Sequence, residues 1–117
     1  MSNDITHLLF ELIANIKYCH FMTENYIEHK ATDHLYNKIN TLYDKYLETY
    51  IGKYGRKKAQ TKKNINLNSY DGKIEIYIQN AIKKIDEVYK KQDNDLQSVL
   101  DEIKVSLNQF IYFLHLK

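Results

Sequence analysis

Hydrophobic residues recur every three or four positions along most of the chain, which is the period of an amphipathic helix. Polar breaks divide the pattern into four stretches, which predict helices over about 4–22, 26–54, 70–91 and 94–116. In the first and second stretches, the positions expected to face a common core are Ile5, Leu8, Leu9, Leu12, Ile13, Ile16, Cys19, Leu35, Ile39, Leu42, Tyr43, Tyr46, Leu47, Tyr50 and Tyr54. In the third and fourth they are Ile74, Tyr77, Ile78, Ala81, Ile82, Ile85, Val88, Tyr89, Leu96, Val99, Leu100, Ile103, Leu107, Phe110, Ile111 and Leu114.

The breaks hold residues that start and stop helices. Asn25 precedes the second helix as its N-cap, and Glu28 follows three positions later, which is the pattern of a capping box. Gly55 is placed to end this helix as a C′ glycine. Asp93 or Asn94 is expected to cap the last helix. These signals fix the expected ends of the second helix and the start of the fourth.

The break from 55 to 69 is the longest and is expected to contain no helix. At about 3.3 Å per extended residue it reaches over roughly 40 Å, whereas a helix of about 24 residues spans roughly 36 Å. The second and third helices can therefore run parallel, joined by one long crossover, as in ferritin-like bundles. We predict an all-α, ferritin-like four-helix bundle with a long B–C crossover loop, formed as a single domain over 1–117.

Composition narrows the class of protein further. The 117 residues include no proline, three glycines and 44% hydrophobic residues, which favours long helices over disorder. The single cysteine, Cys19, excludes an internal disulfide and a cysteine-based zinc site. No apolar run approaches the roughly 18 residues of a membrane span, and the N-terminus does not resemble a signal peptide. We therefore expect no membrane partner and a cytoplasmic location, meaning the host cytoplasm or the virion if the protein is viral. Abundant Lys, Asn, Ile and Tyr suit an AT-rich genome, and many phage genomes are AT-rich.

The predicted crossover is basic, with no acidic residue among its positions, and the net charge of the chain is +2. Such a segment can contact the phosphates of nucleic acid or an acidic protein surface. It lacks interleaved aromatic residues and a recognition motif, so a solvated loop is the plainer interpretation. Its five bases are Arg56, Lys57, Lys58, Lys62 and Lys63.

Four residues have the chemistry of metal ligands: His20, His29, Asp44 and Glu48. Asp44 and Glu48 are four apart, so they share one helical face, more than about 90° from the apolar stripe. His29 precedes Asp44 by fifteen residues, which is roughly 22 Å on a continuous helix. One chain therefore cannot bring all four to one ion, whereas two antiparallel chains about a two-fold axis can. The alternative is that the carboxylates are solvated and the histidines structural. No Glu-x-x-His motif occurs, which argues against a di-iron site inside one bundle.

The segment HFMTENYIEHKATDHLYNKINTLYDKYLETYIGKYG resembles the Dps family of small ferritin-like proteins, which protect DNA in starved bacteria. His20 and Phe21 match the histidine and aromatic pair near the end of the family's first helix, where the aromatic is usually tryptophan. His29, Asp44 and Glu48 match the second histidine and the acidic pair. The chain looks most similar to short ferritin-like proteins encoded by tailed phages and related viruses. The resemblance implies an intersubunit iron site, with both histidines from one subunit and both carboxylates from its partner, and an iron(II) oxidation of the ferroxidase type.

Two functions of different classes remain open. The first is a metal-binding ferritin-like protein that holds iron, with manganese or zinc as alternatives. Because Leu47 and Ile51 flank the Asp44–Glu48 strip, we expect a homodimer, or a larger homo-oligomer, with two copies of the second helix antiparallel. The second is a non-catalytic structural or assembly protein of a phage or virus that keeps the fold and a vestigial site. Histidines that are hydrogen-bonded to backbone and far from any acid would favour the second.

Overall fold

The computed structural model describes residues 4–67 and 73–116, which form five α-helices and no strand. The prediction of an all-α chain is confirmed. The helices are α1 (Asp4–Met22), α2 (Tyr26–Tyr54), α3 (Arg56–Ala59), α4 (Ile74–Tyr89) and α5 (Asn94–Leu114). The predicted bounds of α1 and α2 agree with the structure. α4 is shorter than predicted because Lys73 precedes it and it ends at Tyr89, and α5 ends two residues early. Positions 70–72 lie outside the described residues.

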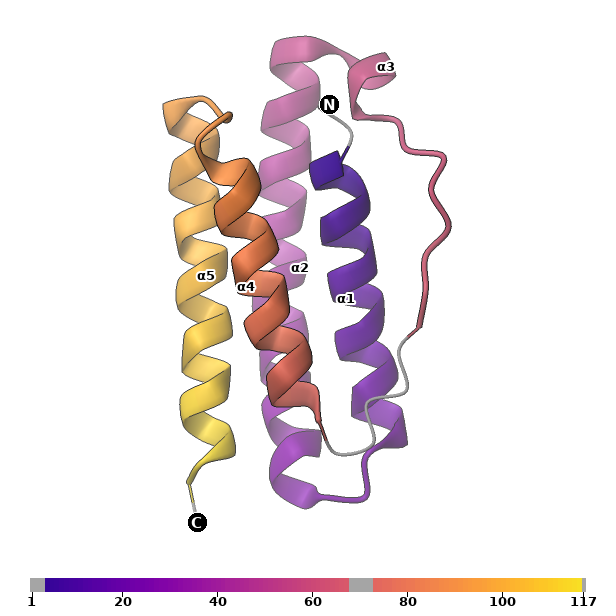
Figure 1. Cartoon of the computed structure of the whole chain (residues 1–117), viewed down its shortest axis with the longest axis vertical. Coiled ribbons are helices and arrows are strands. Elements are labelled where there is room, and N and C mark those ends of the chain that lie inside the picture. The colour runs from indigo at the N-terminus through magenta and orange to yellow at the C-terminus, as the bar shows by residue number, and fades with distance from the viewer. Residues whose placement is uncertain (1–3, 68–72, 117) are drawn as a thin grey trace.

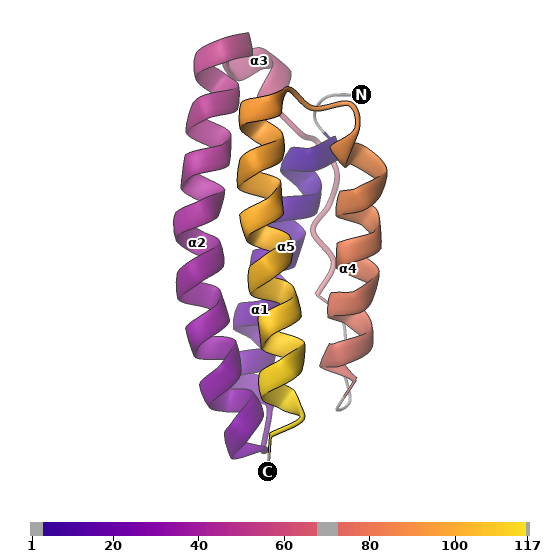
Figure 2. The ribbon, with the colours of Figure 1, turned by 90° about the vertical axis from the view of Figure 1, so that its left-hand side faces the viewer.

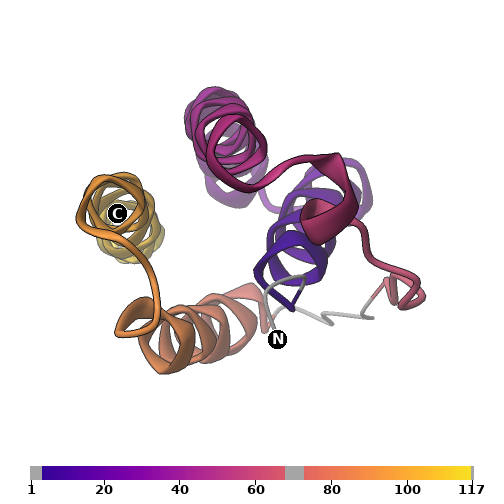
Figure 3. The same cartoon turned by 90° about the horizontal axis from the view of Figure 1, so that it is seen from above.

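The four long helices lie side by side along the 43 Å axis of the molecule (Figure 1). α1 and α5 run in one direction, while α2 and α4 run in the other (Figures 1 and 2). Seen from above, the four helices surround a common centre (Figure 3). Each packs on two neighbours: α1 on α2 and α4, and α5 on α2 and α4. The parallel helices α2 and α4 therefore lie diagonally opposite each other.

The apolar stripes of all four long helices meet in one core. Full burial of a Leu, Ile or Phe side chain stabilises a fold by about 1.5–3 kcal/mol, so this core accounts for the association of the helices. Cys19 is completely buried, as expected of a small apolar side chain in the stripe of α1. Leu47 and Ile51, which we expected to flank an outer strip, are half-buried and pack against the core. The largest fully buried residues are Tyr46, Phe110, Ile5, Leu9, Leu12, Ile16, Ile39, Ile74, Ile78, Ile85, Leu96 and Leu100.

A turn of three residues joins α1 to α2, and its capping differs in part from the prediction. The Asn25 side chain accepts a hydrogen bond from the Glu28 backbone N–H at 2.9 Å, as an N-cap should. The reciprocal bond of a capping box does not form. The Glu28 carboxylate instead accepts from the Thr23 hydroxyl at 2.8 Å, and the Asn25 N–H donates to that same hydroxyl. Thr23 is close enough to take both partners, so it replaces the direct contact.

The crossover contains one short helix, contrary to prediction. Gly55 ends α2 with φ 88°, a backbone angle that favours glycine, and its N–H donates to the Ile51 carbonyl. The chain then forms the single turn of α3, whose Ala59 is buried in the core. That anchor at Ala59 explains why the segment coils here instead of extending directly from Gly55.

Beyond α3 the extended part of the crossover follows the outer side of α1 (Figure 1). The Asn15 side chain donates to the Asn66 carbonyl at 2.9 Å, and the Asn66 N–H donates to the Glu11 carboxylate at 3.0 Å. The His7 ring contacts the Asn64 carbonyl at 2.9 Å. Polar groups on α1 thus hold the crossover backbone and carry it from one end of the molecule to the other, where α4 begins.

Candidate metal site

His20 and His29 come together at the turn between α1 and α2. His20 lies in the last turn of α1 and His29 in the first turns of α2. The imidazole rings stack with centroids 4.1 Å apart and planes inclined by 20°. Two nitrogens bound to one tetrahedral ion at ~2.0–2.1 Å lie about 3.3 Å apart. The ring centroids are near that spacing, but an imidazole lone pair lies in its ring plane, so the two rings must tilt out of this stack before both can bind one ion.

The hydrogen bonds of the two rings fix their tautomers. Nδ1 of His20 donates to the His29 carbonyl at 3.0 Å, and Nδ1 of His29 donates to the His20 carbonyl at 3.1 Å. The Thr32 hydroxyl is a second partner of His20 Nδ1 at 3.3 Å. A carbonyl only accepts, so each neutral ring carries its proton on Nδ1 and keeps Nε2 as an acceptor. Among the described residues, neither Nε2 has a hydrogen-bond partner.

Asp44 and Glu48 lie on the exposed side of α2, away from these histidines. Neither carboxylate makes a hydrogen bond or an ion pair within residues 4–67 and 73–116. Because α2 is continuous from Tyr26 to Tyr54, the separation of His29 and Asp44 along it is about 22 Å. No group of three or more His, Cys, Asp or Glu side chains that could hold a metal occurs in the described part of the chain. A single chain thus supplies the two histidines at one place and the two carboxylates at another. The site with all four ligands stays a prediction.

His20 and His29 fulfil one of the two conditions that would indicate a structural role. Both are hydrogen-bonded to backbone, as a structural role requires, but only through Nδ1. Histidines that bind metals usually make this same contact, since it orients the ring and leaves Nε2 for the ion. Backbone bonding therefore does not separate the two functions. Proximity to an acid depends on a second copy of the chain.

The remaining histidines are elsewhere. His7 contacts the crossover and lies 3.6 Å from the Glu11 carboxylate. His115 contacts Glu75 at 2.7 Å on the surface. His34 is exposed, with its ring edge against Phe113. These three histidines are therefore surface or packing residues and lie apart from the stacked pair.

A polar cluster at the opposite end of the molecule was missed by sequence reasoning. The Lys53 ammonium lies 2.9 Å from Asp93 and 2.8 Å from Asp95, and the Tyr54 hydroxyl donates to Asp93. The hydrogen bonds from Tyr54 and Lys53 lower the pKa of Asp93, and that from Lys53 lowers the pKa of Asp95. Tyr54, expected in the core, is instead 40% exposed, because the last turn of α2 lies beside the α4–α5 turn. The cluster joins the end of α2 to that turn and contains no unpaired acid that points to catalysis.

The five basic residues of the crossover are all exposed. The Lys58 ammonium lies over the Tyr54 ring at 5.6 Å from its centroid. A contact of this segment with nucleic acid or an acidic protein stays a prediction.

Comparison with known proteins gives a family without an assigned function. The model of the family of unknown function DUF5856 matches residues 20–114. The chain belongs to this family. The DUF5856 match includes His20, His29, Asp44 and Glu48.

The DUF5856 chain is also similar to a phage protein, the "Uncharacterized 14.6 kDa protein in mobD-ri intergenic region" of Enterobacteria phage T4. The two are 30% identical over 110 residues, which cover 94% of this chain and 84% of the phage protein. This likeness is consistent with the expected link to phages. No solved structure matches the chain. Neither of the two matches is to a Dps or ferritin protein, so that resemblance rests on the motif. No described helix is both long enough and apolar enough to cross a membrane.

Proposed function

We propose that this DUF5856 protein is a ferritin-like homodimer with two equivalent metal sites between its subunits. Each site would take His20 and His29 from one copy and Asp44 and Glu48 from the other. The observation that carries the proposal is the histidine pair, in which both rings are held by backbone through Nδ1 and both Nε2 atoms stay available.

The order and direction of the helices support a ferritin-like bundle. Two antiparallel hairpins, α1–α2 and α4–α5, are joined by a crossover that makes α2 and α4 parallel. One long crossover of this kind is the topology of ferritin-like folds. The short α3 lies within that crossover and does not change the direction of the long helices.

The geometry of α2 sets where the two-fold axis would pass. If two copies of α2 run antiparallel and His29 of one copy meets Asp44 and Glu48 of the other, the axis passes halfway between them, close to Asn37. The adjoining face of α1 carries Phe10, whose ring is 44% exposed and rests edge-on against Tyr43. A partly exposed aromatic side chain on the helix next to α2 is what a subunit contact would cover.

The donor set suits a divalent ion of intermediate softness. Two imidazole nitrogens with two carboxylates favour iron(II), manganese(II) or zinc, and we put iron first. Bound iron(II) would supply an electron for the reduction of dioxygen or peroxide. The chain's own part is to hold both rings in one tautomer and to keep two unpaired carboxylates at the surface. Because imidazole binds metals only when neutral, binding is expected to weaken in mild acid.

The same histidine pair also supports a second candidate, a structural or assembly protein of a phage. The two reciprocal hydrogen bonds close the α1–α2 turn without any metal. Under this hypothesis the pair stabilises the hairpin, and the four residues bind no ion. The likeness to the phage T4 protein is compatible with it.

The deciding experiment is a double substitution, His29→Ala with Glu48→Ala. We expect the unmodified protein, purified without a chelator or a histidine tag, to bind iron(II) and to oxidise it in air, and the double variant to lose both. His115→Ala with Glu75→Ala is the matched control, since it removes a histidine and a glutamate from an exposed pair worth little to stability. Equal iron binding by the unmodified protein and the double variant would show that these residues do not form the iron site. If neither binds iron, the structural candidate stands.

Placement of the axis can be tested apart from metal binding. Asn37→Cys should form a disulfide between two copies under mild oxidation, because residues at the axis face their own equivalents. The native Cys19 is completely buried, so it should not compete. Glu87→Cys, on the exposed side of α4, is the control that should stay monomeric on a non-reducing gel. A crosslink of equal yield from both variants would mean that collisions, not a fixed dimer, are being trapped.

A further inference from the structure

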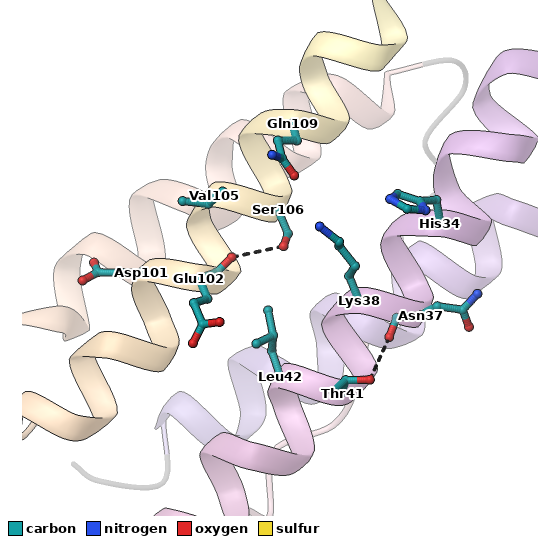
Figure 4. A pocket seen from close by; sticks show the side chains of 10 residues that line it. All are labelled: His34, Asn37, Lys38, Thr41, Leu42, Asp101, Glu102, Val105, Ser106 and Gln109. Carbon is teal, nitrogen blue, oxygen red and sulfur yellow. Dashed lines mark hydrogen bonds between the residues drawn. The ribbon is translucent and has the colours of Figure 1, made fainter.

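The outer side of the α2–α5 pair carries a groove that the proposed metal site does not use. The part between the middles of α2 and α5, called the upper part here, has a volume of about 560 Å³. The part at the C-terminal end of α5, called the lower part, has a volume of about 460 Å³, and His34 lines both. In Figure 4 side chains of α2 and α5 stand along its two sides, with Lys38 and Leu42 opposite Gln109 and Glu102. The groove follows the helices from Glu102 down to the C-terminal end of α5.

The chemistry of the groove changes along its length. At the lower end it is apolar, lined by Tyr26, Ile27, Ala31, Phe113 and Leu116. Several of these are large side chains left in solvent, and Tyr26 is 72% exposed. The upper end is lined mainly by charged and polar side chains, with two apolar residues among them, Leu42 and Val105, of which Val105 is 55% exposed. An exposed apolar patch rimmed by polar residues is typical of a protein–protein contact.

Contacts within the chain fix the register of α2 against α5. The Lys45 ammonium lies 3.6 Å from Glu102, and the His34 ring lies 6.2 Å from that of Phe113. The sum of residue numbers is 147 in both pairs, as it must be for antiparallel helices in one register. That register places Leu42 level with Val105.

We propose that this groove is a second contact between copies of the chain, formed about a two-fold axis that runs along the helices. Such an axis keeps every residue at its own height and lays α2 of one copy over α5 of the other. Lys45 of one copy then lies opposite Glu102 of the other, and Leu42 of one copy lies opposite Val105 of the other. The apolar lower ends of the two grooves face each other. A second copy thus repeats across the interface the pairings that already hold α2 to α5.

The pattern excludes the other way of pairing the same faces. A two-fold axis across the helices would reverse the heights and lay α2 over α2 and α5 over α5. The apolar lower end would then meet the charged upper end, and unpaired charges facing apolar surface are costly. With the axis along the helices, charged residues face charged residues and apolar residues face apolar residues. This match favours a second copy of the chain as the occupant of the groove.

This contact uses none of the four proposed metal ligands, although its face adjoins theirs at Asn37, which lines the groove and lies close to the axis proposed for the metal-site dimer. If both contacts form, dimers pair into tetramers; if only the groove contact forms, the protein is a dimer without a shared metal site. The face is about two helices wide, or about 20 Å, which is small for an interface. We therefore expect a concentration-dependent assembly.

The test is the mass in solution, by light scattering and sedimentation velocity, across micromolar to tens of micromolar protein. Val105→Glu should weaken association by about tenfold or more and halve the mass of the assembly. Ile76→Glu is the matched control, since Ile76 is 54% exposed but lies on α4. Circular dichroism checks that both variants are folded. An unchanged mass for Val105→Glu, or an equal loss for Ile76→Glu, would overturn the proposal.

Two further arms test the register and separate the two contacts. Lys45→Glu should weaken the assembly, and adding Glu102→Lys should restore it, because the pair is reversed at the same level in both copies. Failure of the second change to restore the mass would rule out this axis. Asn37 borders the groove, but an axis along the helices lays it over α5 of the other copy, so Asn37→Cys crosslinking in the Val105→Glu background reports on the metal-site dimer. A crosslink that persists while the mass halves shows that the two contacts are separate.

Discussion

Two buried tyrosines of α2 allow a controlled measurement of what a hydroxyl contributes to this core. Tyr46 is fully buried, and its hydroxyl donates to the Gln92 side-chain oxygen at 2.5 Å. Tyr43 lies three residues earlier and is almost as buried, but among the described residues its hydroxyl has no partner. The same change to phenylalanine therefore removes a satisfied hydroxyl in one case and an unsatisfied one in the other.

The expected effects differ in sign. Tyr46→Phe loses one hydrogen bond, worth about 0.5–1.5 kcal/mol net. Gln92 is half-buried and can turn its freed oxygen to solvent, so the loss should stay near ~1 kcal/mol. Tyr43→Phe removes a buried group whose desolvation, at about 1–3 kcal/mol, is uncompensated in the folded chain. We expect this variant to equal the unmodified protein or to exceed it by up to ~1 kcal/mol.

Urea unfolding followed by far-UV circular dichroism measures both free energies. The dependence of the free energy on urea should be the same for all three proteins, since neither change alters the surface exposed on unfolding. In thermal unfolding, Tyr46→Phe should lower Tm by about 4 °C. If Tyr43→Phe destabilises the fold as much as Tyr46→Phe, the Tyr43 hydroxyl must have a hydrogen-bond partner. The contrast between a satisfied and an unsatisfied buried hydroxyl would then be wrong.

Two further predictions follow from the same core and from the first turn of α2. Burial raises the pKa of Tyr43, Tyr46 and Tyr77 above the usual value of ~10. The unfolded chain then loses these protons above about pH 10 while the folded chain keeps them, so stability falls with rising pH there by about 1.4 kcal/mol per pH unit per tyrosine. Urea titrations between pH 9 and 11 measure how steeply the free energy of unfolding falls with pH. Tyr43→Phe should make this slope shallower by the contribution of one tyrosine. A slope that is unchanged in Tyr43→Phe would contradict the assignment. Asn25→Ala should cost about 1 kcal/mol, because the Glu28 N–H loses its cap, whereas Asn80→Ala on the exposed side of α4 should cost nothing; equal losses in urea would show that the cap is irrelevant.

The sequence predicted the first hairpin better than the second because its ends carry explicit signals. Asn25 and Gly55 bound α2 at the predicted residues, and the hydrophobic period covers the helix between them. The start of α4 has no such signal, and its N-cap residue Lys73 makes no side-chain cap. The helix was therefore predicted to begin too early. The one-turn α3 depends on the burial of Ala59, a tertiary contact that local sequence does not reveal.

The candidate site was predictable in its residue types but not in its local geometry. The spacing of His29, Asp44 and Glu48 and the continuity of α2 were both visible in the sequence. The stacking of His20 on His29 was not, because it depends on how three turn residues fold the two helix ends together. The tautomers follow from carbonyls that only coordinates can place. Convergence of the four ligands involves a second chain, whose position no pattern within one chain determines.

The crossover has a consequence for how the chain can be cut. It is exposed, carries five sites for trypsin within eight residues, and joins two hairpins whose other turns are short. Cleavage there should leave two fragments, α1–α2 and α4–α5, that stay together through the shared core, because the contacts of α1 with α4 and of α2 with α5 do not pass through the cut. The two halves, produced as separate peptides, should then reassemble, and the protein would serve as a split pair.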